Sequence, residues 1–179
     1  PRAKFLVVGI GGYYGAGKDV YADALVDSDL PFSKTFMSKF LQKCIQVINP
    51  WIRTDKELRV SGTILAPAGS FIKYREIEDL VGYTKAKKQE EVREWLQLMG
   101  TEVGRKILGE DTWVNLLRDD LCEIQDSGEH AVITGIRYPN ELSLIHEFGG
   151  KSVWVTRPGF EPTGDTAQHS SERTLGPED

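Results

Sequence analysis

A glycine-rich stretch near the N-terminus constrains the fold more than any other feature of the sequence. Residues 5–10 (FLVVGI) form a short apolar run rich in β-branched residues, which is typical of a strand buried on both faces of a parallel sheet. Residues 12–18 (GYYGAGK) then satisfy the pattern G-x-x-x-x-G-K, and a helical pattern begins at Lys18. This succession of strand, glycine loop and helix favours a three-layer α/β fold with a mainly parallel sheet.

The loop itself predicts a phosphate-binding site. Gly12, Gly15, Ala16 and Gly17 let successive backbone N–H groups point inward as a nest for an anion, and the following helix adds the positive end of its dipole. Lys18 can then bridge the β- and γ-phosphates of a nucleotide as a mobile point charge. The alternative is a glycine-rich turn with an incidental lysine.

The residue after this lysine departs from the usual pattern. Ser or Thr normally stands there and offers a hydroxyl to Mg²⁺, whereas this chain has Asp19 followed by Val20. A carboxylate can hold a hydrated Mg²⁺ through water, because Mg²⁺ gives up its waters reluctantly. Asp19 is therefore either a metal ligand through water or a charge that complements the helix dipole.

Further strands and helices alternate along the chain, as an α/β fold requires. Residues 51–83 lack a clear pattern and are broken by Pro67, Gly69 and Gly82, so we expect an irregular insertion there. We expect strands over 30–36, 130–136 and 152–156, and helices over 37–48, 85–108, 113–124 and 140–148, with Leu96, Met99, Val103 and Ile107 as a core stripe.

Composition limits the classes of partner. The 179 residues carry a net charge of −5, which argues against the broad basic footprint of a nucleic-acid or membrane-surface binder. The length fits one domain with a small inserted lobe. No apolar run approaches a membrane span and the N-terminus does not read as a signal peptide, so we expect a cytoplasmic protein that binds small molecules.

Several later motifs follow the loop in a familiar order. They are 93–102 (REWLQLMGTE), 113–114 (WV), 136–141 (IRYPNE), 149–150 (GG), 157–159 (RPG) and 169–172 (HSSE). Together with the Gly-Lys-Asp of the loop, this ordered set resembles the phage deoxynucleoside monophosphate kinase family, and the resemblance runs from about residue 5 to 175. The resemblance implies a P-loop kinase fold over 1–179 that uses ATP and Mg²⁺ to phosphorylate a deoxynucleoside monophosphate in the cytoplasm of the host.

Two arginines can be placed from the residues themselves. Arg137 directly follows a buried strand and Arg157 follows the next one, so both are expected at the carboxyl edge of the sheet. There, Arg137 would act in catalysis with Lys18, Glu141 would orient it, and Arg157 would help to hold ATP and begin a lid over 157–172. A surface position in a βα turn is the alternative for Arg137.

The resemblance also implies which residues line the monophosphate site. Trp113 would stack on the base, although a place in the core is an equal alternative. The implied set is Tyr14, Arg93, Gly100, Thr101, Trp113, Arg137 and Glu141, with 51–83 as an insertion on the substrate side.

The chain departs from the family at two further places. Gly135 stands where the family usually carries Asp, two residues before Arg137. Members of the family also continue into one more strand and a closing helix, so we expect either a short protein or part of a longer one. A second copy of the chain could then cover the open edge of the sheet in a homodimer.

Three functions compete on this basis. The first is the deoxynucleoside monophosphate kinase, and the second is a P-loop kinase for another small phosphorylated metabolite. The third is a nucleotide-binding protein with weak catalysis, which the absence of Ser or Thr after Lys18 and of Asp at Gly135 would favour.

Overall fold

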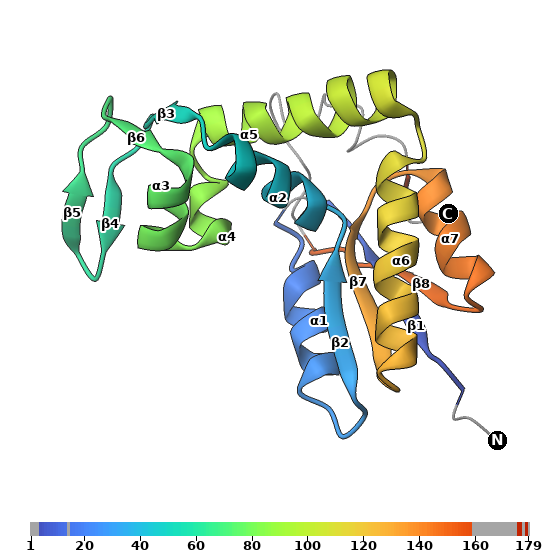
Figure 1. The fold of residues 1–179 in the computed structure, drawn as a ribbon. Coiled ribbons are helices and arrows are strands. Elements are labelled where there is room, and N and C mark those ends of the chain that lie inside the picture. Colours follow the sequence, from blue (N-terminus) through green and yellow to red (C-terminus); the bar gives the residue numbers. More distant parts are fainter. Residues whose placement is uncertain (1–3, 14, 159–174, 177, 179) are drawn as a thin grey trace. The chain divides into compact units, whose positions relative to one another are not determined.

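The computed structural model describes residues 4–13, 15–158, 175–176 and 178 of the chain (Figure 1). Its contacts divide the chain into two compact units, which we call the sheet unit (residues 1–37 and 113–179) and the inserted unit (residues 38–112). Among the described residues, no helix combines the length and the apolarity that crossing a bilayer requires.

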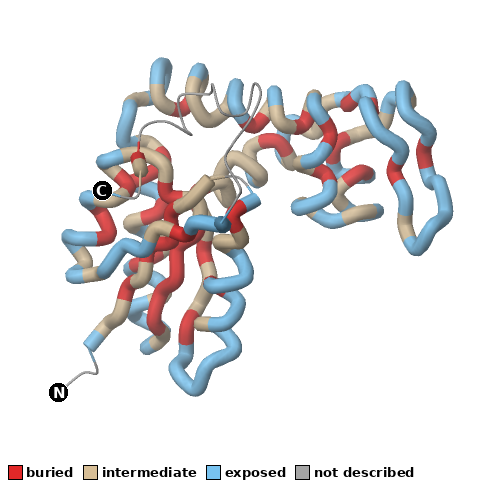
Figure 2. The backbone as a smooth tube through the Cα atoms, turned by 180° about the vertical axis from the view of Figure 1, so that it is seen from behind, coloured by how far each residue is buried: buried red, intermediate tan, exposed pale blue. Residues whose placement is uncertain are grey.

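The sheet unit is built on four parallel strands. In chain order they are β1 (Val7–Gly11), β2 (Phe32–Phe36), β7 (His130–Ile136) and β8 (Lys151–Trp154), and their order in space is β2-β7-β1-β8 (Figure 1). All three pairings are parallel, and buried residues, red in Figure 2, concentrate along the inner strands β1 and β7. The predicted α/β class with a parallel sheet is confirmed.

Helices cover both faces of this sheet, because side chains alternate between the faces along each strand. Ile10 packs on one face in a cluster with Ala22 of α1 (Lys18–Val26). The Cβ position of its neighbour Gly9 faces Ile145 of α7 (Pro139–Glu147) on the other. α6 (Thr112–Asp126) lies on this second face too, where Asp120 accepts a hydrogen bond of 2.6 Å from Thr35. The three-layer arrangement follows from this alternation.

The inserted unit contains four short strands among its helices. The strands are β3 (Trp51–Arg53), β4 (Leu58–Val60), β5 (Thr63–Ala66) and β6 (Phe71–Lys73), paired antiparallel as β3-β6 and β4-β5. The helices are α2 (Lys39–Ile48), α3 (Tyr74–Val81), α4 (Tyr83–Ala86), α5 (Glu90–Gln97) and the π-helix η1 (Leu98–Leu108). Their apolar side chains enclose a core of the unit's own that includes Ile45, Ile52, Tyr74, Ile77 and Val92.

The expectation of an irregular segment over 51–83 is wrong. Ser61 and Gly62 both have positive φ, at 50° and 86°, as the two-residue turn of a tight hairpin requires, and they join β4 to β5. The strands of this segment have three or four residues each, too few for a period-2 pattern to stand out.

The expected core stripe fails at Ile107, which is 74 % exposed, whereas Leu96 is buried. The reason lies in the winding of η1, where Gly109 donates its N–H to the carbonyl of Gly104 five residues earlier. Hydrogen bonds that span five residues put more residues in each turn than an α-helix has, so a stripe spaced for an α-helix turns away from the core. Gly104 is the buried residue of η1.

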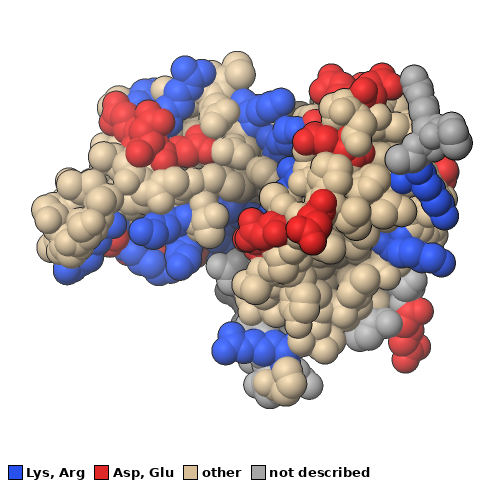
Figure 3. All heavy atoms as spheres, turned by 90° about the horizontal axis from the view of Figure 1, so that it is seen from below, with Lys and Arg blue, Asp and Glu red and all other residues tan. Residues whose placement is uncertain are grey.

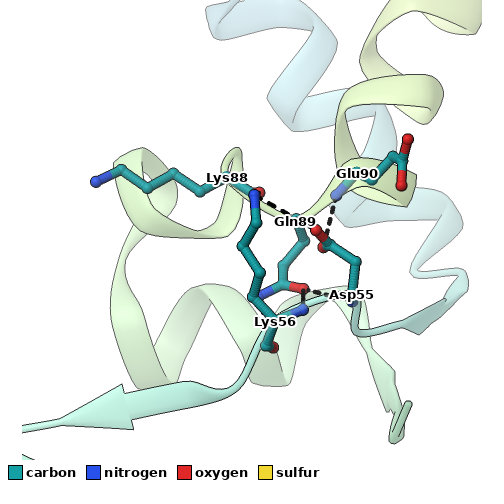
Figure 4. Close-up of polar contacts among 5 residues, drawn as sticks. All are labelled: Asp55, Lys56, Lys88, Gln89 and Glu90. Atoms are coloured by element: carbon teal, nitrogen blue, oxygen red, sulfur yellow. Dashed lines mark hydrogen bonds and ion pairs between the residues drawn. The ribbon is translucent and has the colours of Figure 1, made fainter. Parts of the chain in front are cut away.

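One buried amide joins two connections of the inserted unit (Figure 4). Gln89 is 3 % exposed. Its Oε1 accepts the N–H groups of Asp55 and Lys56 at 3.0 and 3.3 Å, and its Nε2 donates to the carbonyl of Lys56 at 3.2 Å. The Asp55 carboxylate in turn accepts the N–H of Glu90, the first residue of α5, at 2.9 Å. These bonds hold the β3–β4 connection against the start of α5.

Replacing Gln89 with alanine should lower the free energy of unfolding by about 1–3 kcal/mol, because the three hydrogen bonds that its buried amide forms with the backbone of Asp55 and Lys56 are lost. Gln125→Ala, at an exposed position of α6, is the matched control and should change it by less than about 0.5 kcal/mol. Urea denaturation measures both; equal values for the two variants would show that the Gln89 bonds contribute nothing.

Candidate functional site

The ends of three neighbouring strands meet at the carboxyl edge of the sheet unit. Gly11, the last residue of β1, pairs with Ile136 of β7 on one side and with Trp154 of β8 on the other. The loop 12–18 therefore begins beside Arg137, which directly follows β7. Arg157 comes three residues after β8 and is exposed. This is the edge at which open parallel sheets bind their ligands.

The glycines of the loop adopt backbone conformations that other residues rarely reach. Gly12, Gly15 and Gly17 have φ values of 141°, 83° and 98°. A Cβ on Gly12 would lie 2.5 Å from the carbonyl oxygen of Val155, whereas no atom of the described residues lies within 4 Å of the Cβ position of Gly17. The loop thus packs closely on the residue after β8 where it begins, and the described residues leave space where α1 begins. Tyr14 lies outside the described residues.

Lys18 is the first residue of α1 and turns back over the loop. Its Nζ donates hydrogen bonds to the carbonyl oxygens of Gly12 at 2.6 Å and Tyr13 at 2.8 Å. The ammonium group is therefore held at the loop, beside the N-terminus of a helix whose dipole favours anions. Ala16, by contrast, is buried against the core that includes Ala22.

Asp19 is engaged with a lysine of β2. Lys34 Nζ lies 3.1 Å from its Oδ1 and 2.8 Å from Oδ1 of Asp23, one turn further along α1. Burial alone would lower the pKa of Lys34, but hydrogen bonds and charges from Asp23 and Asp19 outweigh it, so the pKa lies above its ordinary value. In the described part of the chain, no three His, Cys, Asp or Glu side chains are grouped to hold a metal ion.

Gly135 forms a bulge in β7 just before Arg137. Ile10 pairs with Thr134, but the next residue, Gly11, pairs with Ile136, so Gly135 is the extra residue. Its φ is 81°, the left-handed conformation that glycine accepts most readily. Because a bulge bends the strand locally, Gly135 changes the course of the backbone that leads to Arg137. The sequence showed a missing carboxylate here, not a bulge.

Glu141 fixes the turn that carries Arg137. Its carboxylate accepts the backbone N–H of Arg137 at 2.7 Å and that of Tyr138 at 3.2 Å, and the residue is 3 % exposed. It is the third residue of α7, where an acidic side chain can cap the helix N-terminus. Glu141 thus holds the backbone of Arg137, and its place in the substrate site stays a prediction.

The remaining candidate residues lie in both units, and some lie outside the described residues. Trp113, in the first turn of α6, is 6 % exposed, which leaves little ring surface for a stacked base in this conformation. Arg93 lies in α5, and Gly100 and Thr101 lie in η1, so these three belong to the inserted unit. Most of the expected lid over 157–172 lies outside the described residues, which include only Arg157 and Pro158 of it.

Sequence reasoning missed two aromatic residues at the loop. Tyr13 and Trp154 meet edge to face, with ring centroids 5.5 Å apart and planes at 88°. Trp154 ends a strand that was predicted, and that place at the carboxyl edge was the available signal. An aromatic side chain in an apolar run gives no further sign that it lies against a glycine loop.

Comparison with known proteins decides the family. Residues 15–179 match the family described as deoxynucleotide monophosphate kinase. The chain belongs to that family. The resemblance predicted from the ordered motifs is thereby confirmed. The chain is also 42 % identical over 55 residues to the deoxynucleoside-5'-monophosphate kinase of Escherichia phage T5, a match that covers 31 % of this chain and 21 % of the relative.

Replacing Gly135 with alanine should destabilise this member of the kinase family by about 1–2 kcal/mol, because an L-residue is strained in the left-handed conformation. Among the residues that the structure describes, no atom lies within 4 Å of the Cβ position, so the loss would report backbone strain and not a clash. Gly176→Ala, also at an open position but without a positive φ, should be close to neutral. Chemical denaturation of both tests this, and unchanged stability at 135 would argue against the bulge.

Proposed function

We propose that the protein transfers the γ-phosphoryl group of ATP to the phosphate of a deoxynucleoside monophosphate, giving ADP and the diphosphate. The observation that carries the proposal is the pairing of Gly11 with Ile136. It starts the loop of Lys18 and the turn of Arg137 side by side, so the two cations can act on one anionic ligand.

The loop fits the triphosphate of the donor. Lys18 is already held at the loop by two carbonyl oxygens, from where its ammonium can reach the β- and γ-phosphates. The described residues leave space at Gly17 for phosphate oxygens at the N-terminus of α1. Both signs of charge occur on each unit in Figure 3, so attraction of a nucleotide depends on these local donors more than on the net charge of −5.

The described residues offer few side chains that could bind Mg²⁺. Asp19 is the acidic residue nearest the loop in sequence, and its carboxylate forms an ion pair with Lys34. A hydrated Mg²⁺ carried by the phosphates could meet this carboxylate only through water. The described residues therefore do not form a dedicated metal site.

Arg137 has the task of neutralising charge on the transferred group. It follows β7 beside the loop, and Glu141 fixes its backbone. A preorganised cation stabilises the transition state because no reorganisation is needed when charge develops. Arg157 is the second strand-end arginine at this edge, and we assign it to the donor phosphates.

The family and the phage relative support the choice of acceptor. The relative is a deoxynucleoside-5'-monophosphate kinase, and the chain spans 21 % of that protein in the match. Carried over to this chain, the name makes deoxynucleoside monophosphates the first acceptors to test. Arg93, Gly100 and Thr101 of the inserted unit are the residues we assign to acceptor binding.

Arg137→Ala should lower kcat by roughly 10³–10⁵-fold, the range for a transition-state arginine. The matched control is Arg118→Ala in the same unit, which removes an exposed ion pair of 2.6 Å with Glu147 and should leave kcat unchanged. Steady-state kinetics with ATP and each acceptor measure both. Near-full activity of Arg137→Ala would remove this residue from the mechanism.

The acceptor is tested by ADP release across the four deoxynucleoside monophosphates and their ribose counterparts. We expect turnover with at least one deoxynucleotide. Turnover of a sugar or alcohol phosphate alone would instead favour a kinase for another metabolite. ATP binding without transfer to any acceptor would favour a nucleotide-binding protein with weak catalysis.

A further inference from the structure

Trp154 lies against the start of the glycine loop. It ends β8 and pairs with Gly11, the last residue of β1. Its ring atoms Cε3 and Cζ3 lie 2.7 and 2.9 Å from the position that a Cβ on Gly11 would occupy. Since atoms this close would clash with any side chain, the indole ring fills the space that glycine leaves at residue 11.

The same ring also contacts the loop at Tyr13. The two aromatic rings meet edge to face at 5.5 Å, a geometry worth about 0.5–1.5 kcal/mol beyond burial. One residue further, Val155 donates its N–H to the carbonyl of Gly11 at 2.9 Å. The end of β8 thus fixes the loop at its first residues, by a backbone hydrogen bond and by aromatic packing.

Tyr13 connects this packing to the lysine. Its carbonyl oxygen and that of Gly12 accept the hydrogen bonds from Lys18 Nζ. A Cβ on Gly12 would in turn lie 2.5 Å from the carbonyl of Val155. The two oxygens that hold the ammonium group therefore belong to the residues that β8 fixes in place.

The indole N–H of Trp154, unlike the ring carbons, makes no favourable contact among the described residues. Nε1 is buried and has no hydrogen-bond partner in the described part of the chain, which costs free energy. The N–H group therefore does not explain why a tryptophan occupies this position, whereas its contacts with Gly11 and Tyr13 do. A phenylalanine would lose the unpaired donor and keep part of the ring contact.

We propose that Trp154 is a positioning residue for Lys18: packed on Gly11 and Tyr13, its ring holds the loop carbonyls that aim the ammonium group at the phosphates of ATP. This inference rests on the proposed function, because it assumes that the loop binds ATP. It adds that ATP affinity depends on an aromatic side chain of β8 that need not touch the nucleotide.

Calorimetric titration with ATP, well below the melting temperature of each variant, tests the inference. Trp154→Ala and Tyr13→Ala should each raise the Kd for ATP about two- to tenfold, the equivalent of one aromatic pair. Trp154→Phe should retain most of the affinity. Trp51→Ala, which removes an indole that is 58 % exposed in the inserted unit, is the control and should leave the Kd unchanged.

The KM for the acceptor separates positioning from general damage. We expect it to stay constant in Trp154→Ala, whereas a fold that is merely weakened would change donor and acceptor binding together. Wild-type Kd values for ATP in both alanine variants, or an equal rise in the acceptor KM, would overturn the inference. A wild-type protein that does not bind ATP would overturn the proposed function and this inference with it.

Discussion

β7 lies in the sheet between β1 and β2, and all of its residues except Gly135 are buried. Its hydrogen bonds on both sides set the register of the sheet unit, and the bulge at Gly135 then shifts that register by one residue at the carboxyl edge. Arg137 follows immediately, with its backbone N–H held by the buried carboxylate of Glu141. The backbone of this arginine is thus held by the sheet register and by Glu141.

On the other side of β1, the end of β8 packs closely against the start of the loop. Gly11 and Gly12 have no room for a Cβ, because the ring of Trp154 and the carbonyl of Val155 lie at those positions. These glycines are therefore needed for the close approach of β8 as well as for the backbone conformation of the loop. The loop is held from both ends, by β8 where it begins and by α1 from Lys18 onward. Lys18 lies between these supports, with its ammonium group on the loop carbonyls.

The sequence predicted the parts of this fold that carry strong periodic signals. The strand over 130–136 was predicted with its observed bounds, because four of its seven residues are β-branched. The hairpin turn at Ser61 and Gly62 was not predicted, because its strands are too short to show a period-2 pattern. The site was predictable only in part: loop and strand ends follow from order along the chain, whereas the contact of Trp154 with Tyr13 depends on tertiary packing.

The central claim is that the loop around Lys18 holds the phosphates of ATP while Arg137 faces the same ligand. A crystal structure of the full chain with ATP bound tests it most directly. The account predicts the β- and γ-phosphates within hydrogen-bond distance of Lys18 Nζ and of the backbone N–H groups at 15–18, with the Arg137 guanidinium directed at the γ-phosphate. Phosphates bound elsewhere on the protein, or an Arg137 side chain directed away from them, would contradict it.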